Sequence, residues 1–183
     1  MKTIKLMALL VLPLLMVACQ TEKISKTQLK LDQFTLKTRD LSKRWKFVGG
    51  DRSTDYGGES YTVTYLIDDH NFLSHTISIY ANSSQATDAY EKWNNEWFNV
   101  TSEWQPSNYS PLDQKDDYKF DCLKLSPESP LVGCRYLQRH NEIISFVRVG
   151  LDNTTLTFAE LDGILGILDE RLSTANLEET PIP

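Results

Sequence analysis

Residues 61–79 read YTVTYLIDDHNFLSHTISI and contain two short runs of alternating apolar and polar side chains. A period of two is the period of a β-strand with one buried face. The residues that share this face are Tyr61, Val63, Tyr65, Ile67, Leu73, His75, Ile77 and Ile79. Pairing Ile67 with Leu73 puts both sets on the same side and places Tyr65 opposite His75. The stretch therefore predicts an antiparallel hairpin.

The pattern that follows the hairpin is that of a helix, and the same series recurs later in the chain. The first helix is expected to be capped by Asn82 or Ser83 and to end near Asn99. Its apolar stripe is Ala86, Ala89, Tyr90, Trp93 and Trp97. Strands are expected again at 118–125, 131–138 and 143–151. A second helix opens at Thr157, which forms a Ser/Thr-x-x-Glu capping box with Glu160.

These elements predict an α+β fold of two strand-turn-strand-helix units in one domain, residues 34–175. Its mainly antiparallel sheet should have about five to six strands, with two helices on one face. A short strand at 45–48 should precede a polar loop between the glycine pairs 49–50 and 57–58. Residues 99–117 show no regular period, and the tail 176–183 should be frayed.

The N-terminus has the three parts of an export signal. Lys2 and Lys5 supply a positive start, residues 6–16 are apolar apart from Pro13, and Val17-Ala18 precede Cys19. The apolar run is too short for a membrane span, which needs about 20 residues. We expect residues 1–18 to be a signal peptide.

The run Leu15-Met16-Val17-Ala18-Cys19 resembles the bacterial lipobox, although Met16 stands where leucine is commonest. The resemblance implies cleavage before Cys19 and diacylation of this cysteine, with residues 19–33 as a tether. Two acyl chains suffice for stable anchoring. The chain would then face the extracytoplasmic side of the cell membrane or outer membrane. The alternatives are an ordinary cleaved signal with a chance cysteine, or an uncleaved anchor helix.

Charge and cysteine content fit export. Without Lys2 and Lys5 the chain has 17 basic and 25 acidic residues, a net charge of −8, and nothing that suggests a nucleic-acid partner. Only 23–46 is basic-leaning, and its lysines could lie against anionic head groups. Besides Cys19 the chain has Cys122 and Cys134, which face one another when Leu125 is paired with Leu131. We expect a disulfide between them.

One group of side chains is a candidate pocket. His75 lies on the apolar face of its strand, where it is either a buried, hydrogen-bonded ring or a pocket-lining group. Tyr65 is its expected neighbour, and Trp104 in the 99–117 loop has a ring that could stack on a sugar. No nucleophile motif, metal-ligand spacing or cofactor signature occurs.

The sequence thus favours a non-enzymatic binding or structural module of the cell envelope, with an envelope protein or a glycan as partner. The alternative is an enzyme or small-ligand-binding protein with a pocket near His75 and the 99–117 loop.

Overall fold

The computed structural model describes residues 31–69, 71–99, 104–106, 117–123, 131–152 and 157–174. The expected signal peptide, Cys19, the Leu125–Leu131 pair and the tail 176–183 lie wholly or partly outside these residues. None of the helices in the described part is long and apolar enough to cross a bilayer.

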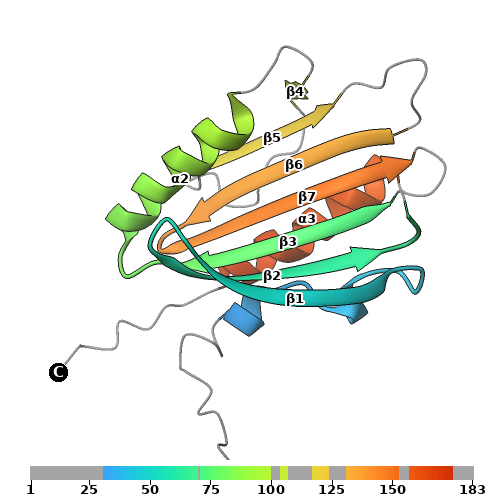
Figure 1. The fold of residues 1–183 in the computed structure, drawn as a ribbon, viewed down its shortest axis with the longest axis horizontal. Coiled ribbons are helices and arrows are strands. Elements are labelled where there is room, and N and C mark those ends of the chain that lie inside the picture. The colour runs from blue at the N-terminus through green and yellow to red at the C-terminus, as the bar shows by residue number, and fades with distance from the viewer. Residues whose placement is uncertain are drawn as a thin grey trace, which may run out of the picture.

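The described chain is α+β, built on one antiparallel sheet with the strand order β1-β2-β3-β7-β6-β5-β4 (Figure 1). The strands are β1 (Lys46–Asp55), β2 (Gly58–Leu66), β3 (Phe72–Ile79), β4 (Trp104–Pro106), β5 (Asp117–Leu123), β6 (Leu131–His140) and β7 (Ile143–Asp152). The helices are η1 (Thr38–Asp40), α2 (Ser83–Phe98) and α3 (Phe158–Ser173). The fold class is confirmed, although the sheet has seven strands where five to six were expected.

β1 is much longer than predicted. The prediction of a polar loop between the glycine pairs 49–50 and 57–58 is wrong, because β1 occupies most of that stretch. β1 runs to Asp55, which pairs with Gly58 at the start of β2. The connecting residues Tyr56 and Gly57 both have positive φ, 50° and 91°, as in the tight turns that suit the twist of a hairpin. Eight of the ten β1 residues are exposed and the other two are partly exposed, so no alternation marks the strand.

The β2–β3 hairpin forms, but its predicted register is wrong by two residues. Val63, and not Tyr65, pairs with His75, while Tyr65 pairs with Leu73. The turn is centred one residue earlier than expected, because Leu66 pairs with Phe72 and the Ile67 N–H donates to the Asn71 carbonyl at 3.0 Å. A shift of two residues keeps every side chain on its predicted face, so the core assignment survives the error.

The two long helices cover opposite faces of the sheet, which corrects the prediction that they share one face. Val147 and Val149 of β7 belong to the same core cluster as Leu165 of α3. Ile144 and Phe146, which alternate with them, pack with α2. Figure 1 shows α2 in front of the sheet and α3 behind it. A central strand that is apolar on both faces requires a cover on each side.

The helix caps follow the sequence. The Asn82 side chain accepts a hydrogen bond from the Gln85 N–H at 2.9 Å, and Thr157 and Glu160 form the expected capping box. At the other end of the chain, Leu31 and Phe34 are helical and only 4% and 6% exposed. The packed domain therefore includes at least residues 31–33, which the sequence assigned to the tether.

Candidate functional site

His75 is completely buried between the sheet and the N-terminal segment 31–41. Its Nδ1 accepts a hydrogen bond from the Leu36 backbone N–H at 3.1 Å, and its Nε2 lies 3.1 Å from the Ser145 hydroxyl oxygen. Because Nδ1 is an acceptor, the proton of the neutral ring is on Nε2, which donates to Ser145. Both ring nitrogens are thus used in the core.

The charge state of this ring agrees with its position. The pKa of His75 is lowered from 6.5 to about 3, mainly by burial and also by the positive charge of Arg171, while Asp40 opposes the shift. An imidazole in this environment stays neutral at physiological pH. Of the two accounts of His75, the structure supports the buried, hydrogen-bonded ring.

Tyr65 forms a hydrogen bond with the backbone of Leu36, the same residue that bonds to His75. Its phenol donates to the Leu36 carbonyl at 2.9 Å, and burial raises the pKa of Tyr65. The N–H and the C=O of Leu36 are therefore both satisfied by side chains of neighbouring strands. These bonds fasten segment 31–41 to the sheet, because a buried backbone group without a partner is costly.

α3 fastens the segment from the other side. Arg171 donates to the Thr35 carbonyl at 3.0 Å and to Asp40 Oδ1 at 2.6 Å. The second oxygen of Asp40 accepts the Lys37 N–H at 2.6 Å. Segment 31–41 is thus packed against both the sheet and α3, and its charged groups lie at the outer surface.

Trp104 does not join this group. It belongs to β4, which pairs with β5 at the far edge of the sheet, and three strands separate β4 from β3. The proposed pocket of His75, Tyr65 and Trp104 is therefore wrong as a single site. Of the 99–117 loop, the structure describes only residues 99, 104–106 and 117.

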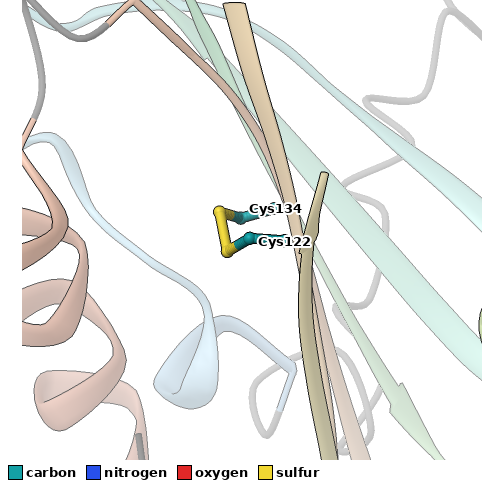
Figure 2. The surroundings of a disulfide bond; sticks show 2 residues. All are labelled: Cys122 and Cys134. Atoms are coloured by element: carbon teal, nitrogen blue, oxygen red, sulfur yellow. A yellow bond between two sulfur atoms is a disulfide. The ribbon is translucent and has the colours of Figure 1, made fainter. Parts of the chain in front are cut away.

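The expected disulfide is present. Cys122 of β5 and Cys134 of β6 are register partners with Cα atoms 4.1 Å apart, and their sulfur atoms are bonded. Figure 2 shows the bridge on the side of the sheet that faces α3. Cys134 is 2% exposed and belongs to the core cluster under that helix. The bridge is thus a buried cross-strand staple.

The described surface has a groove between segment 31–41 and the strands β1 and β2, which we name the N-terminal groove. Its volume is about 520 Å³, within the range of small-molecule sites. The residues that line it are Asp32, Thr35, Leu36, Lys37, Thr38, Arg39, Phe47, Tyr61, Val63 and Tyr65.

The apolar part of the groove is aromatic. The rings of Phe47 and Tyr65 meet edge to face with centroids 5.6 Å apart. The Tyr61 ring lies across β1 so closely that a Cβ at Gly50 would come within 2.3 Å of its hydroxyl. Gly50 therefore leaves room for this ring. Aromatic faces of this kind bind flat apolar groups.

The polar part of the groove is basic. Lys37 pairs with Asp32 at 3.7 Å, so these two charges offset one another. Arg39 is exposed on the wall, and the Arg52 guanidinium lies 5.8 Å from the centroid of the Tyr61 ring. Arg39 is thus a cation on the groove wall, and Arg52, which does not line the groove, lies beside the Tyr61 ring that does. Among described residues, no group of three His, Cys, Asp or Glu side chains could hold a metal ion.

Sequence reasoning missed the groove because half of it is built by residues read as a tether. The available signal was the apolar spacing of Leu31, Phe34 and Leu36, which is too short to be read as an amphipathic element. It also missed Asp169 of α3, a fully buried carboxylate that accepts a hydrogen bond from Gln138 at 2.7 Å.

Comparison with known proteins gives a fold but no family. No protein-family model and no curated protein matches the chain. Among solved structures, the chain is similar to the extracellular domain of PknH from Mycobacterium tuberculosis, with a TM-score of 0.54 and 9% sequence identity. The match covers 79% of this chain and 95% of that domain. At this identity, the likeness shows that the two domains share a fold.

Proposed function

We propose that this chain is an exported lipoprotein whose domain is a non-enzymatic binding module. In this proposal, lipid on Cys19 holds it at the cell membrane or outer membrane, facing the extracytoplasmic side. Its site is the N-terminal groove, and its ligand is a small molecule with an anionic group and a flat or chain-like apolar part. The observation that carries the proposal is the exposed Arg39 on the wall of a groove that is lined by three aromatic side chains.

Three features support the export and anchoring part. The leader has the layout of a secretory signal, and its last five residues resemble a lipobox. The Cys122–Cys134 disulfide is of a kind that persists in oxidising compartments. The similar solved domain is described as extracellular.

The groove supports an anionic ligand because its charges and its apolar surface lie side by side. Arg39 and Arg52 can pair with a carboxylate, sulfate or phosphate group, and arginine suits such planar or tetrahedral anions. Phe47, Tyr61 and Tyr65 offer the apolar contact. An uncharged ligand would gain only the second contribution, so the groove should prefer the anion.

The enzyme alternative loses its main support in this geometry. A general acid or base must reach the proton that it transfers, whereas His75 is buried with both nitrogens engaged. The proposal keeps the small-ligand part of the alternative and places it in the groove that begins at Tyr65.

The anchor is tested by mass spectrometry of the N-terminal peptide from membrane-extracted protein. We expect an acylated Cys19 as the first residue, and the Cys19→Ala variant should keep its leader and lack lipid. Normal processing of this variant would contradict the lipoprotein assignment.

The groove is tested by thermal unfolding of the full chain with matched compounds: decanoate and naphthalene-2-carboxylate, each against its neutral alcohol and its quaternary ammonium analogue. A ligand at a hundred times its Kd should add about 2.7 kcal/mol to the free energy of unfolding. We expect a rise in Tm with the anions only. A flat result would favour an envelope protein or a glycan as partner.

A further inference from the structure

Two apolar side chains are exposed together at the start of the edge strand β1. Phe47 and Val48 expose 52% and 59% of their surface, the largest fractions among the exposed large hydrophobic residues of the described chain. Val48 lies at a bulge, because the register passes from the Phe47–Tyr65 pair to the Gly49–Thr64 pair. Adjacent exposed apolar residues at a sheet edge favour contact with another surface.

The charge around these residues is opposite to that of the chain. Residues 37–48 contain five basic side chains and one acid, while the whole chain has a net charge of −6. Arg44 pairs with Glu160 at 3.1 Å, Lys37 with Asp32, and Asp40 with Arg171. Lys43 and Lys46 are exposed and form no ion pair with any described residue. We name Lys43, Lys46, Phe47 and Val48 the basic edge.

The basic edge is also close in sequence to the proposed anchor. The packed domain reaches back at least to Leu31, and residues 20–30 span at most about 40 Å when fully extended. Segment 31–40 runs beside β1 at the same side of the molecule (Figure 1). α2, by contrast, lies over β5, β6 and β7, on the side of β3 away from β1. A tethered domain therefore carries its basic, apolar corner near the membrane.

We propose that the basic edge docks on an anionic bilayer, with Phe47 and Val48 among the head groups and Lys43 and Lys46 against lipid phosphates. This inference rests on the anchoring part of the proposed function. The pairing of apolar side chains with lysines is the composition of an interfacial membrane contact. Each lysine near an anionic surface should change the ratio of docked to undocked domain about fivefold.

The docking is tested on the full lipidated chain with an environment-sensitive probe. Val48→Cys adds a thiol that nitrobenzoxadiazole (NBD) can label, because Cys122 and Cys134 form a disulfide. The matched control is Asp88→Cys, an exposed position on α2. Both proteins are placed in vesicles of phosphatidylcholine alone, or of phosphatidylcholine and phosphatidylglycerol at about 70:30.

The expected result is a blue-shifted, brighter emission of the Val48 probe only in the anionic vesicles. Lys43→Glu/Lys46→Glu should remove the shift by lowering the docked ratio at least about 25-fold. Lys43→Arg/Lys46→Arg should retain it, and the Asp88 probe should respond to neither lipid composition.

Two results would overturn the proposal. Equal emission in both kinds of vesicle, with Cys19 acylated, would mean that the anchored domain does not dock. A shift that depends on protein concentration and not on lipid charge would mean that a second copy of the chain covers the edge. Failure of the anchor itself appears separately, as an N-terminal peptide without lipid.

Discussion

The Nδ1 of His75 accepts a hydrogen bond from the backbone N–H of Leu36 at 3.1 Å, across 39 positions of sequence. Tyr65 binds the carbonyl of the same residue. Two side chains that the sequence marks as a candidate pocket thus fix the N-terminal segment on the sheet. The groove opens beside this junction, so its shape depends on His75 even though His75 does not line it.

The first prediction concerns the pH dependence of stability. The pKa of His75 is about 3 in the folded chain and about 6.5 when unfolded. Between these values the unfolded chain binds a proton that the folded chain excludes. Folding should therefore weaken as pH falls from 6.5 toward 3, by up to about 1.4 kcal/mol per pH unit from this group.

Urea unfolding at pH 4 to 7 measures this effect. His75→Gln should be less stable at pH 7, since its amide cannot reproduce both ring contacts. The slope of its free energy of unfolding against pH should also be smaller than that of the wild type, by an amount that corresponds to at most one bound proton. Equal slopes for the two proteins would show that His75 titrates normally in the folded state.

The second prediction compares two arginine ion pairs that join the N-terminal part of the domain to α3. Arg171 and Asp40 are 22% and 8% exposed, whereas Arg44 and Glu160 are 46% and 42% exposed. Arg171→Ala leaves buried acceptors unsatisfied and should cost about 1–3 kcal/mol. Arg44→Ala should cost less than about 1 kcal/mol. If chemical denaturation shows equal losses of unfolding free energy for the two variants, Arg171 does not fasten the N-terminal segment to α3 in the way that its contacts suggest.

The third prediction uses two glycines in different surroundings. A Cβ at Gly58 would come within 2.6 Å of the buried Tyr80 ring, while one at Gly163 would meet nothing within 4 Å. Gly58→Ala should destabilise the domain by about 1–3 kcal/mol through overpacking. Gly163→Ala, at an exposed position inside α3, should stabilise it by about 0.5–1 kcal/mol. In thermal unfolding, Gly58→Ala should lower the Tm and Gly163→Ala should raise it, and this difference in sign tests the prediction.

The fourth prediction concerns the disulfide. Cys122 and Cys134 are 12 positions apart, and a loop of this size is worth about 3 kcal/mol in the chain-entropy model. Reduction of the wild type should lower the urea midpoint accordingly. Cys122→Ala/Cys134→Ala should already have the lower midpoint and should not respond to reductant. A response of this variant would assign the effect to another part of the chain.

The sequence predicts features that depend on local patterns. Alternation revealed β2 and β3, capping chemistry located the starts of α2 and α3, and a hairpin register placed Cys122 opposite Cys134. The β2–β3 register was two residues off because Ile67 closes a five-residue turn with Asn71, and alternation is unchanged by a shift of two. Such shifts are decided by turn geometry.

Features that depend on long-range contacts were not predictable in this way. β1 is exposed on both faces and has no period. That α2 and α3 cover opposite faces of the sheet could have been inferred only from β7, whose side chains are apolar on both faces. The groove forms because Leu36 lies against His75 and Tyr65. No local pattern in residues 31–40 predicts this contact.

The central claim, that the N-terminal groove binds an anionic ligand with an apolar part, is tested most directly by calorimetric titration of naphthalene-2-carboxylate into three proteins. The wild type and Lys119→Glu, which reverses an exposed charge on β5, should bind with the same affinity. Arg39→Glu, on the groove wall, should bind at least about tenfold more weakly, the equivalent of one lost charge-assisted hydrogen bond. Equal affinity of all three proteins, or no binding to the wild type, would contradict the account.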